Sequence, residues 1–425
     1  MNLILKTYKK KIFNGKFTND TIWLLFSQAF IIFGGALITL LITRFMGLDM
    51  LGYFNQALAY YGILSIIFSL GLNNTLVKKI SENELLDVTN NLIFSNALIQ
   101  TFCQSLLLTI STIIFFFVFP GILSSFKLAN SLWIVLVALP IYNLNKNFDA
   151  FYSGSRNQRM VSINRTIRWL LFCFLVFLVC ITTKNIDYLF STFFCSEFIL
   201  LFFNIIVLRK EIVFNWNYDI VISNLKFGIS TFPAEIVSVL LSNIDIIILG
   251  YFLSKYDLGF YSLMIFIGKT LLVFPTVISQ NINPIVSRLW AENKKKELYA
   301  KLSHVFKINF LVSSLLIIAF IIALPFILEI FNVKYPDSYP YFYFVLFGVF
   351  VSSLFYWLGG VFIMVGMNRL NNQRTLFLFA LTSLNILLLT NFFNVFGAYL
   401  AFMVNSISST FVFYTLLNRL KYQTQ

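Results

Sequence analysis

Long apolar runs separated by short polar breaks fill most of this chain. A helix needs roughly 20 apolar residues to cross the hydrocarbon core of a bilayer, and runs of this length exclude the shorter strands of a membrane barrel. The pattern therefore predicts an all-α integral membrane protein. Its twelve predicted spans are 22–43, 53–72, 93–119, 131–152, 167–183, 187–208, 227–250, 258–282, 305–328, 340–366, 375–394 and 397–418.

The composition agrees with a chain that lies in lipid. Of its 425 residues, 59% are hydrophobic and only 11% are charged, which is too few charges for the surface of a soluble protein. The net charge of +14 raises the question of a nucleic-acid partner, so the positions of the basic residues matter.

The basic residues are distributed very unequally between the two sides of the predicted membrane. Of 31 Lys and Arg, 24 lie on the side of the N-terminus and two inside spans, and only five lie on the opposite side: Arg44, Lys127, Lys184, Lys255 and Lys334. This is the positive-inside pattern. We therefore expect residues 1–21 and 419–425 to be cytoplasmic, and we expect the basic excess to meet anionic membrane lipid rather than nucleic acid.

A short break between two spans occurs twice. TRFMGLDMLGYF, residues 43–54, aligns with GYFLSKYDLGFY, residues 250–261, at an offset of 207, which pairs Gly52 with Gly259. Further along, NTLVKKI at 74–80 aligns with NPIVSRL at an offset of 209. Chance similarity between two apolar segments is the alternative explanation of this repeat, but the glycine and basic positions agree as well as the leucines do.

This repeat divides the chain into two six-helix bundles. We expect an N-terminal bundle at 22–208, a cytoplasmic linker at 209–226 and a C-terminal bundle at 227–418. Because six is an even number, both bundles enter the membrane from the same side. A pseudo-twofold axis along the membrane normal is the expected relationship, as in transporters with parallel repeats.

Ionisable residues inside spans cost roughly 2.5 to 3.5 kcal/mol each on insertion scales, so they usually face an interior or a water-filled cavity. The six in this chain are Lys146, Asp149, Glu197, Glu235, Asp245 and Lys269. Glu197 and Lys269 lie near mid-span and, with Glu235, are the first cavity candidates. Lys146 and Asp149 are three residues apart and could neutralise each other. Lys269 could pair with Asp245 or equally with Glu235.

Two arginines lie at the ends of predicted spans. Arg44 ends the first span at the outer surface, where it is either a snorkelling anchor or a contact for an anionic substrate. Arg168 opens the fifth span from the cytoplasmic side. Pro140, Pro233 and Pro275 interrupt three spans and allow bends there.

The sequence contains no enzyme motif. His304 is the only histidine, and the spacing of the four cysteines matches no metal or redox motif. We expect neither catalytic activity nor a bound metal or other cofactor, and leave open whether a proton or a sodium ion drives transport. Residues 287–307 combine apolar and charged positions, which predicts an interfacial amphipathic helix.

The runs ITRFMGLDMLGYFNQALAYYGILSIIFSLGLNNTLVKK, FGISTFPAEIVSVLLSNIDIIILGYFLSKYDLGFYSL and NVFGAYLAFMVNSISS resemble bacterial lipid-linked oligosaccharide flippases, the O-antigen and exopolysaccharide exporters of the multidrug/oligosaccharidyl-lipid/polysaccharide superfamily. The resemblance implies two bundles around a cavity that opens alternately to either side of the bacterial inner membrane. It also implies a polyprenyl-diphosphate-linked oligosaccharide as substrate, and a polysaccharide polymerase and glycosyltransferases as partners in polysaccharide biosynthesis.

The intramembrane charges do not simply match a diphosphate substrate, which calls for a cationic cavity. Two lysines against four acids give a formal charge of −2. These acids favour the alternative of a cation-coupled multidrug exporter, whereas the basic cytoplasmic loops favour the flippase. A membrane glycosyltransferase or polymerase is the third reading, which the short outer loops disfavour.

Overall fold

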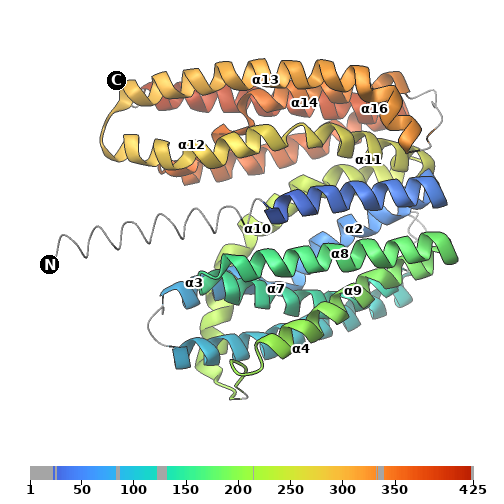
Figure 1. Cartoon of the computed structure of the whole chain (residues 1–425), viewed down its shortest axis with the longest axis vertical. Helices are drawn as coiled ribbons and strands as arrows, with labels where there is room; N and C mark the ends of the chain where they lie inside the picture. Colours follow the sequence, from blue (N-terminus) through green and yellow to red (C-terminus); the bar gives the residue numbers. More distant parts are fainter. Residues whose placement is uncertain are drawn as a thin grey trace. The chain divides into compact units, whose positions relative to one another are not determined.

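The computed structural model describes residues 23, 26–82, 87–121, 132–213, 215–331, 333 and 339–422, and within these ranges the regular structure is helical with no strand. The predicted basic segment at 1–21 lies outside the described residues, as do Lys127 and Lys334. The all-α prediction is confirmed. Figure 1 shows the helices.

Seven predicted spans correspond to single described helices. The first helix runs over Phe26–Met46. The others are α4 (Asp87–Val118), α8 (Gln158–Thr182), α9 (Ile186–Val207), α10 (Tyr218–Phe252) and α13 (Lys295–Ile330), together with α2 (Leu48–Ser69), which continues after a break into α3 (Leu72–Glu82). At this break Leu70 and Gly71 both have positive φ, of 44° and 75°.

Three further spans are each built from two shorter helices. They are α6 (Leu132–Val137) with α7 (Leu139–Gly154), α11 (Lys255–Thr270) with α12 (Val273–Ala291), and α14 (Phe342–Tyr356) with α15 (Leu358–Met364). Pro140 lies in the first turn of α7, where the missing N–H of proline costs no helical hydrogen bond. Pro275 lies in the first turn of α12, beyond a 41° bend. Pro233, by contrast, lies inside the continuous helix α10.

The last two predicted spans are joined in α16 (Asn368–Tyr422), which follows a 3-10 turn at Tyr339–Tyr341 and the α14–α15 pair. Asn394 interrupts α16 with φ 49° and ψ −127°. Nine described helices are long and apolar enough to cross a membrane, or ten if α11 and α12 form one span. Division of α16 at Asn394 and the α6–α7 pair complete the predicted twelve.

The prediction of a separate amphipathic helix at 287–307 is wrong. Its residues belong to the last turns of α12 and the first turns of α13. The break between the two helices is short, and Asn293 turns the chain there with a φ of 54°. Both helices continue into apolar segments, so the charged residues are the polar ends of two spans.

The chain forms two compact units. Unit 1 contains residues 1–45 and 60–236, and unit 2 contains residues 46–59 and 237–425. The predicted bundle limits at 22–208 and 227–418 stay predictions. In this division α2 contributes its first turns to unit 2 and its remainder to unit 1, while α10 passes from unit 1 to unit 2 after residue 236.

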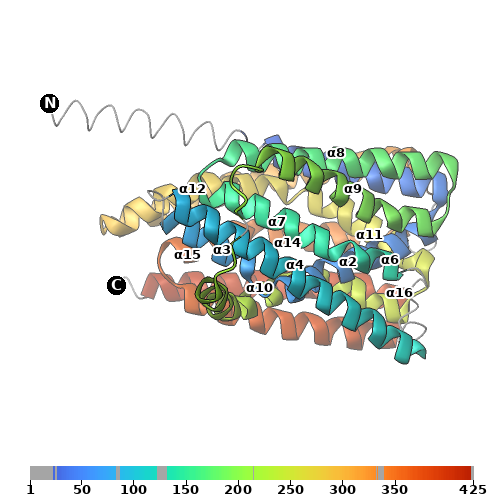
Figure 2. The same cartoon turned by 90° about the horizontal axis from the view of Figure 1, so that it is seen from below.

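Helix α7 is the centre of unit 1. It contacts α3, α4, α8 and α9, and Figure 2 shows it running among them. Asn143 and Asn147 are one turn apart and face α4, where they donate hydrogen bonds to Ser105 Oγ at 3.1 Å and Thr101 Oγ1 at 2.7 Å. These bonds give each buried amide nitrogen an acceptor in an apolar interior, whereas the two Oδ1 atoms have no hydrogen-bond partner among the described residues.

In unit 2 the start of α2 crosses the start of α11 at two glycines. A Cβ atom on Gly52 would lie 2.2 Å from the carbonyl oxygen of Lys255, and one on Gly259 would lie 1.9 Å from the carbonyl oxygen of Leu48. The repeat offset of 207 relates Gly52 to Gly259 and Leu48 to Lys255. Each close contact is therefore the repeat-related copy of the other, and only glycine permits this approach.

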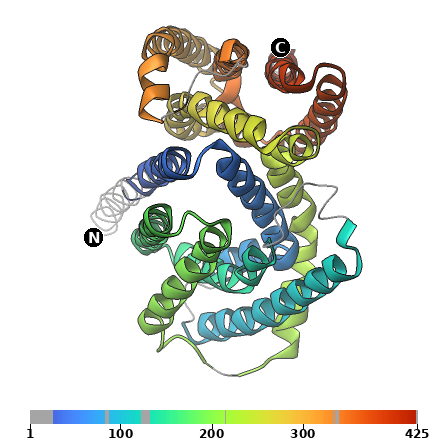
Figure 3. The same ribbon diagram turned by 90° about the vertical axis from the view of Figure 1, so that its right-hand side faces the viewer.

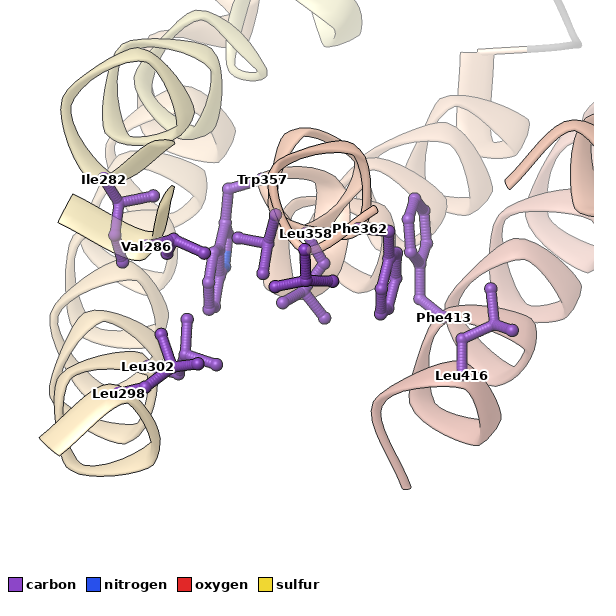
Figure 4. Packing of buried hydrophobic residues seen from close by; sticks show 11 residues of the cluster. Ile282, Val286, Leu298, Leu302, Trp357, Leu358, Phe362, Phe413 and Leu416 are labelled. Atoms are coloured by element: carbon purple, nitrogen blue, oxygen red, sulfur yellow. The ribbon is translucent and has the colours of Figure 1, made fainter. Parts of the chain in front are cut away.

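The apolar core of unit 2 lies where α12, α13, α15 and α16 meet. Trp357 is 1% exposed, and Figure 4 shows its ring beside Val286, with Phe362 beside Phe413. The rings of Phe362 and Phe413 stack with centroids 6.2 Å apart. Figures 1 and 3 show α13, α14 and α16 side by side with roughly parallel axes.

Candidate functional site

The most heavily charged interior position is in unit 1, where Arg168 of α8 binds two carboxylates. Its Nη1 is 3.2 Å from Oδ2 of Asp149 on α7, and its Nε is 2.9 Å from Oε1 of Glu197 on α9. Exposed fractions are 17% for the Arg168 side chain, 15% for Asp149 and 5% for Glu197. A planar guanidinium with five donors suits this bridging position, whereas a lysine ammonium would serve it less well.

Amides complete the shell around these carboxylates. Asn164 donates to Oδ1 of Asp149 at 2.9 Å, and Asn145 donates to Oε2 of Glu197 at 2.8 Å. Three of the four carboxylate oxygens thus accept a hydrogen bond, and the fourth, Oε1 of Glu197, is held by the ion pair with Nε. Nε and Nη2 of Arg168 are buried without a hydrogen-bond partner among the described residues. We call these five residues the arginine cluster.

The position of Arg168 differs from the sequence expectation. The apolar run suggested that the fifth span begins near residue 167, which would put Arg168 at the surface. The helix begins at Gln158, capped by the side chain of Asn157, so Arg168 is already in its third turn. Charged residues on the first turns of α8 hid the true start from a reading by hydropathy.

Lys146 lies one turn before Asp149 on α7, yet the partner of Asp149 is Arg168. The Nζ of Lys146 lies 5.0 Å from the ring centroid of Tyr142. Glu235 accepts a hydrogen bond from Asn74 at 3.3 Å. The possible ion pair between Lys146 and Asp149 is not formed among the described residues, because Arg168 of α8 pairs with Asp149 instead.

In unit 2 the Nζ of Lys269 is 4.0 Å from Oδ2 of Asp245, and the Lys269 side chain is 45% exposed. Asp245 was one of the two partners expected for Lys269. The pair lies at a cavity of about 200 Å³ whose lining includes Tyr261 and Asn405. Oδ1 of Asn405 accepts a hydrogen bond from Asn385 at 2.7 Å. The cavity thus combines a loosely held cation with carboxylate, amide and hydroxyl groups.

Arg44 is exposed at the end of the first helix, as expected. None of its nitrogens lies within 4.0 Å of a carboxylate among the residues that the structure describes. The position fits either role expected for it.

The charge of the interior changes once Arg168 is counted inside the span. Unit 1 has three acids and two basic groups, a formal charge of −1, and the Asp245–Lys269 pair in unit 2 is neutral. The sum of −1 replaces the −2 expected from sequence. Three of the four intramembrane carboxylates, Asp149, Glu197 and Asp245, form an ion pair in the described part of the chain.

The buried asparagine side chains of unit 1 were not among the site residues predicted from the sequence. Asn145, Asn164 and Asn204 are fully buried, and Asn204 donates to Oδ1 of Asn145 at 3.2 Å. The stretch YNLNKNFD at 142–149 contained the signal, because asparagines inside a span need partners there. No described group of three or more His, Cys, Asp and Glu is arranged to hold a metal ion.

The sequence matches two family models. A model described as polysaccharide biosynthesis protein matches residues 17–290, which is more than half of the chain. A second model, described as MatE, matches residues 232–389. No curated protein matches the chain.

Solved structures share the fold at low sequence identity. An inward-facing multidrug resistance MATE family transporter of the MOP superfamily superposes with a TM-score of 0.73 at 12% identity, over 91% of this chain and 93% of that one. The lipid II flippase MurJ in an inward closed conformation gives 0.70 at 13% identity, over 94% and 87%. The MATE multidrug transporter DinF-BH gives 0.66 at 15%, over 95% of both chains. The chain therefore belongs to the polysaccharide biosynthesis protein family and has the fold of the MOP superfamily transporters.

Proposed function

We propose that this protein is a flippase that moves a polyprenyl-diphosphate-linked oligosaccharide from the cytoplasmic to the outer leaflet by alternating access, for surface polysaccharide biosynthesis. The observation that carries the proposal is the family match over residues 17–290. A fold shared with the lipid II flippase MurJ supports a lipid-linked substrate.

The charges of the interior are compatible with an anionic substrate. Asp149 and Glu197 are both occupied by Arg168, and Asp245 has Lys269 within 4.0 Å. These three carboxylates are thus held by cations and offer little to a cationic drug. Lys269 is held at a long distance and is 45% exposed, so its ammonium remains available to phosphate oxygens.

We assign different roles to the predicted site residues on this basis. Lys269 and Lys146 are the proposed phosphate contacts, each within its own unit, and Arg44 is a third at the outer end of the first helix. Arg168 positions Glu197 and Asp149 and holds unit 1 together. Asp245 sets the position of Lys269, and Glu235 is held by Asn74.

The second candidate is a cation-coupled multidrug exporter. The match of residues 232–389 to the MatE model and the superposition on the MATE transporter favour it. Under this alternative, Asp245 would have to release Lys269 in order to bind a cation.

Deletion of the gene in its native host tests the proposal. We expect loss of surface polysaccharide, completed lipid-linked repeat units trapped in the cytoplasmic leaflet, and recovery on complementation with the wild-type gene. Intact polysaccharide together with increased sensitivity to cationic drugs would overturn the flippase and support the exporter.

A further inference from the structure

An apolar groove opens in unit 2 beside α13, outside the sites described above. Its volume is about 520 Å³. Leu302 and Trp357 form its floor and belong to the buried core shown in Figure 4. Aromatic rings form its walls: the centroid of Phe355 is 5.3 Å from that of Phe306 and 6.3 Å from that of Tyr414. A long, thin apolar group fits such walls.

The groove lies where α13 changes from polar to apolar. Residues 295–307 contain four lysines and one glutamate, a surplus of +3 with His304 neutral, and residues 308–328 contain no charge at all. The α13 residues that line the groove fall within 299–306. They therefore lie at the level where lipid headgroups meet hydrocarbon.

Two exposed lysines flank the groove on one face of α13. Lys296, Ala300, Ser303 and Lys307 follow one another at spacings of four, three and four, which places them in one row along a helix. Ala300 and Ser303 line the groove, so one lysine lies toward each end of it. Glu297, the one acid in this part of α13, is four residues before Lys301 and is compensated by it.

From this juxtaposition we infer that the groove is a binding site for an anionic phospholipid, with one acyl chain between the aromatic walls and the phosphate held by Lys296 or Lys307. A zwitterionic lipid offers the same chain without net charge and gains less from a basic row. The bound lipid would connect α13, α14 and α16 and thereby stabilise unit 2. The inference does not depend on the transported substrate.

Native mass spectrometry of the purified full-length protein tests this site. Phosphatidylglycerol and phosphatidylethanolamine with identical acyl chains, together with a polyprenyl phosphate, are added at equal concentration, and the first bound lipid is counted. We expect a clear preference for phosphatidylglycerol, reduced about fivefold for each lysine removed.

The variants K296Q/K307Q and S303W separate charge from shape. The first removes the two cations, and the second fills the groove from an exposed position on its rim. The variant R209Q/K210Q removes the same charge from an exposed turn of unit 1 and is expected to bind as the wild type does. Equal occupancy in the wild type and in K296Q/K307Q, equal binding of the two lipids, or a preference for a polyprenyl phosphate would each overturn the inference.

Discussion

Asn55 and Ser262 are 207 residues apart in the chain, and Nδ2 of Asn55 donates a hydrogen bond to Oγ of Ser262 at 2.8 Å. This separation equals the offset of the sequence repeat, so equivalent positions of the two copies touch each other. The two glycine contacts one turn earlier obey the same relationship. The short break that recurs in the sequence therefore forms a symmetric helix crossing within unit 2.

Replacement of Gly52 or Gly259 by alanine tests this crossing. The new Cβ atoms would lie 2.2 and 1.9 Å from backbone oxygens, and backbone cannot move aside as a side-chain end does. We expect each variant to lose about 1 to 3 kcal/mol of stability, measured by thermal unfolding in detergent. Gly359→Ala is the matched control, because its Cβ would meet ring atoms of Phe413 at 3.9 Å. Unchanged stability of G52A and G259A would contradict the crossing.

Removal of the Arg168 charge tests the arginine cluster. Arg168→Gln leaves two buried carboxylates without their cation, which typically costs about 3 to 5 kcal/mol. We expect a large loss of folded protein, and partial recovery when Asp149→Asn and Glu197→Gln are added. Denaturant unfolding of the purified variants measures both effects. If R168Q unfolds as the wild type does, the cluster does not stabilise unit 1.

Substitution of Lys269 is expected to reduce transport alone, whereas substitution of Glu197 is expected to reduce both transport and stability. Lys269 is 45% exposed and its nitrogen is 4.0 Å from Asp245, so Lys269→Gln should cost at most about 1 kcal/mol yet abolish transport. Glu197 is 5% exposed inside the arginine cluster, so Glu197→Gln should lower protein stability together with transport. Surface polysaccharide and membrane protein level are measured in the same cells. Normal polysaccharide with well-expressed K269Q would remove Lys269 from the site.

Replacement of Asn394 by glycine is expected to stabilise the protein. The φ of 49° and ψ of −127° at Asn394 lie in a region that glycine populates readily and that other residues occupy at a cost of about 1 to 3 kcal/mol. We expect Asn394→Gly to raise the unfolding temperature and Asn394→Val to lower it. The opposite order would show that the asparagine side chain, rather than the backbone turn, defines the junction of the last two helices.

The sequence predicts the spans because lipid imposes one strong constraint, that apolar runs become helices. The repeat also predicts the equivalence of Gly52 and Gly259, since glycine marks a close backbone approach. The position of Arg168 was predicted wrongly because the hydropathy pattern marks only the apolar part of α8. The polar first turns of the same helix, which begin at Gln158, do not appear in that pattern. The partners of Asp149 and Lys146 depend on tertiary packing, which spacing along α7 does not encode.

The most direct test of the central claim is translocation by the purified protein in proteoliposomes. A fluorescent polyprenyl-diphosphate oligosaccharide is placed in the membrane, and its arrival in the opposite leaflet is followed by a quencher that cannot cross. The flippase account predicts transfer by the wild type, and none by K269Q or by protein-free vesicles. Transfer no faster than in protein-free vesicles, in a preparation that pumps a cationic dye, would contradict it.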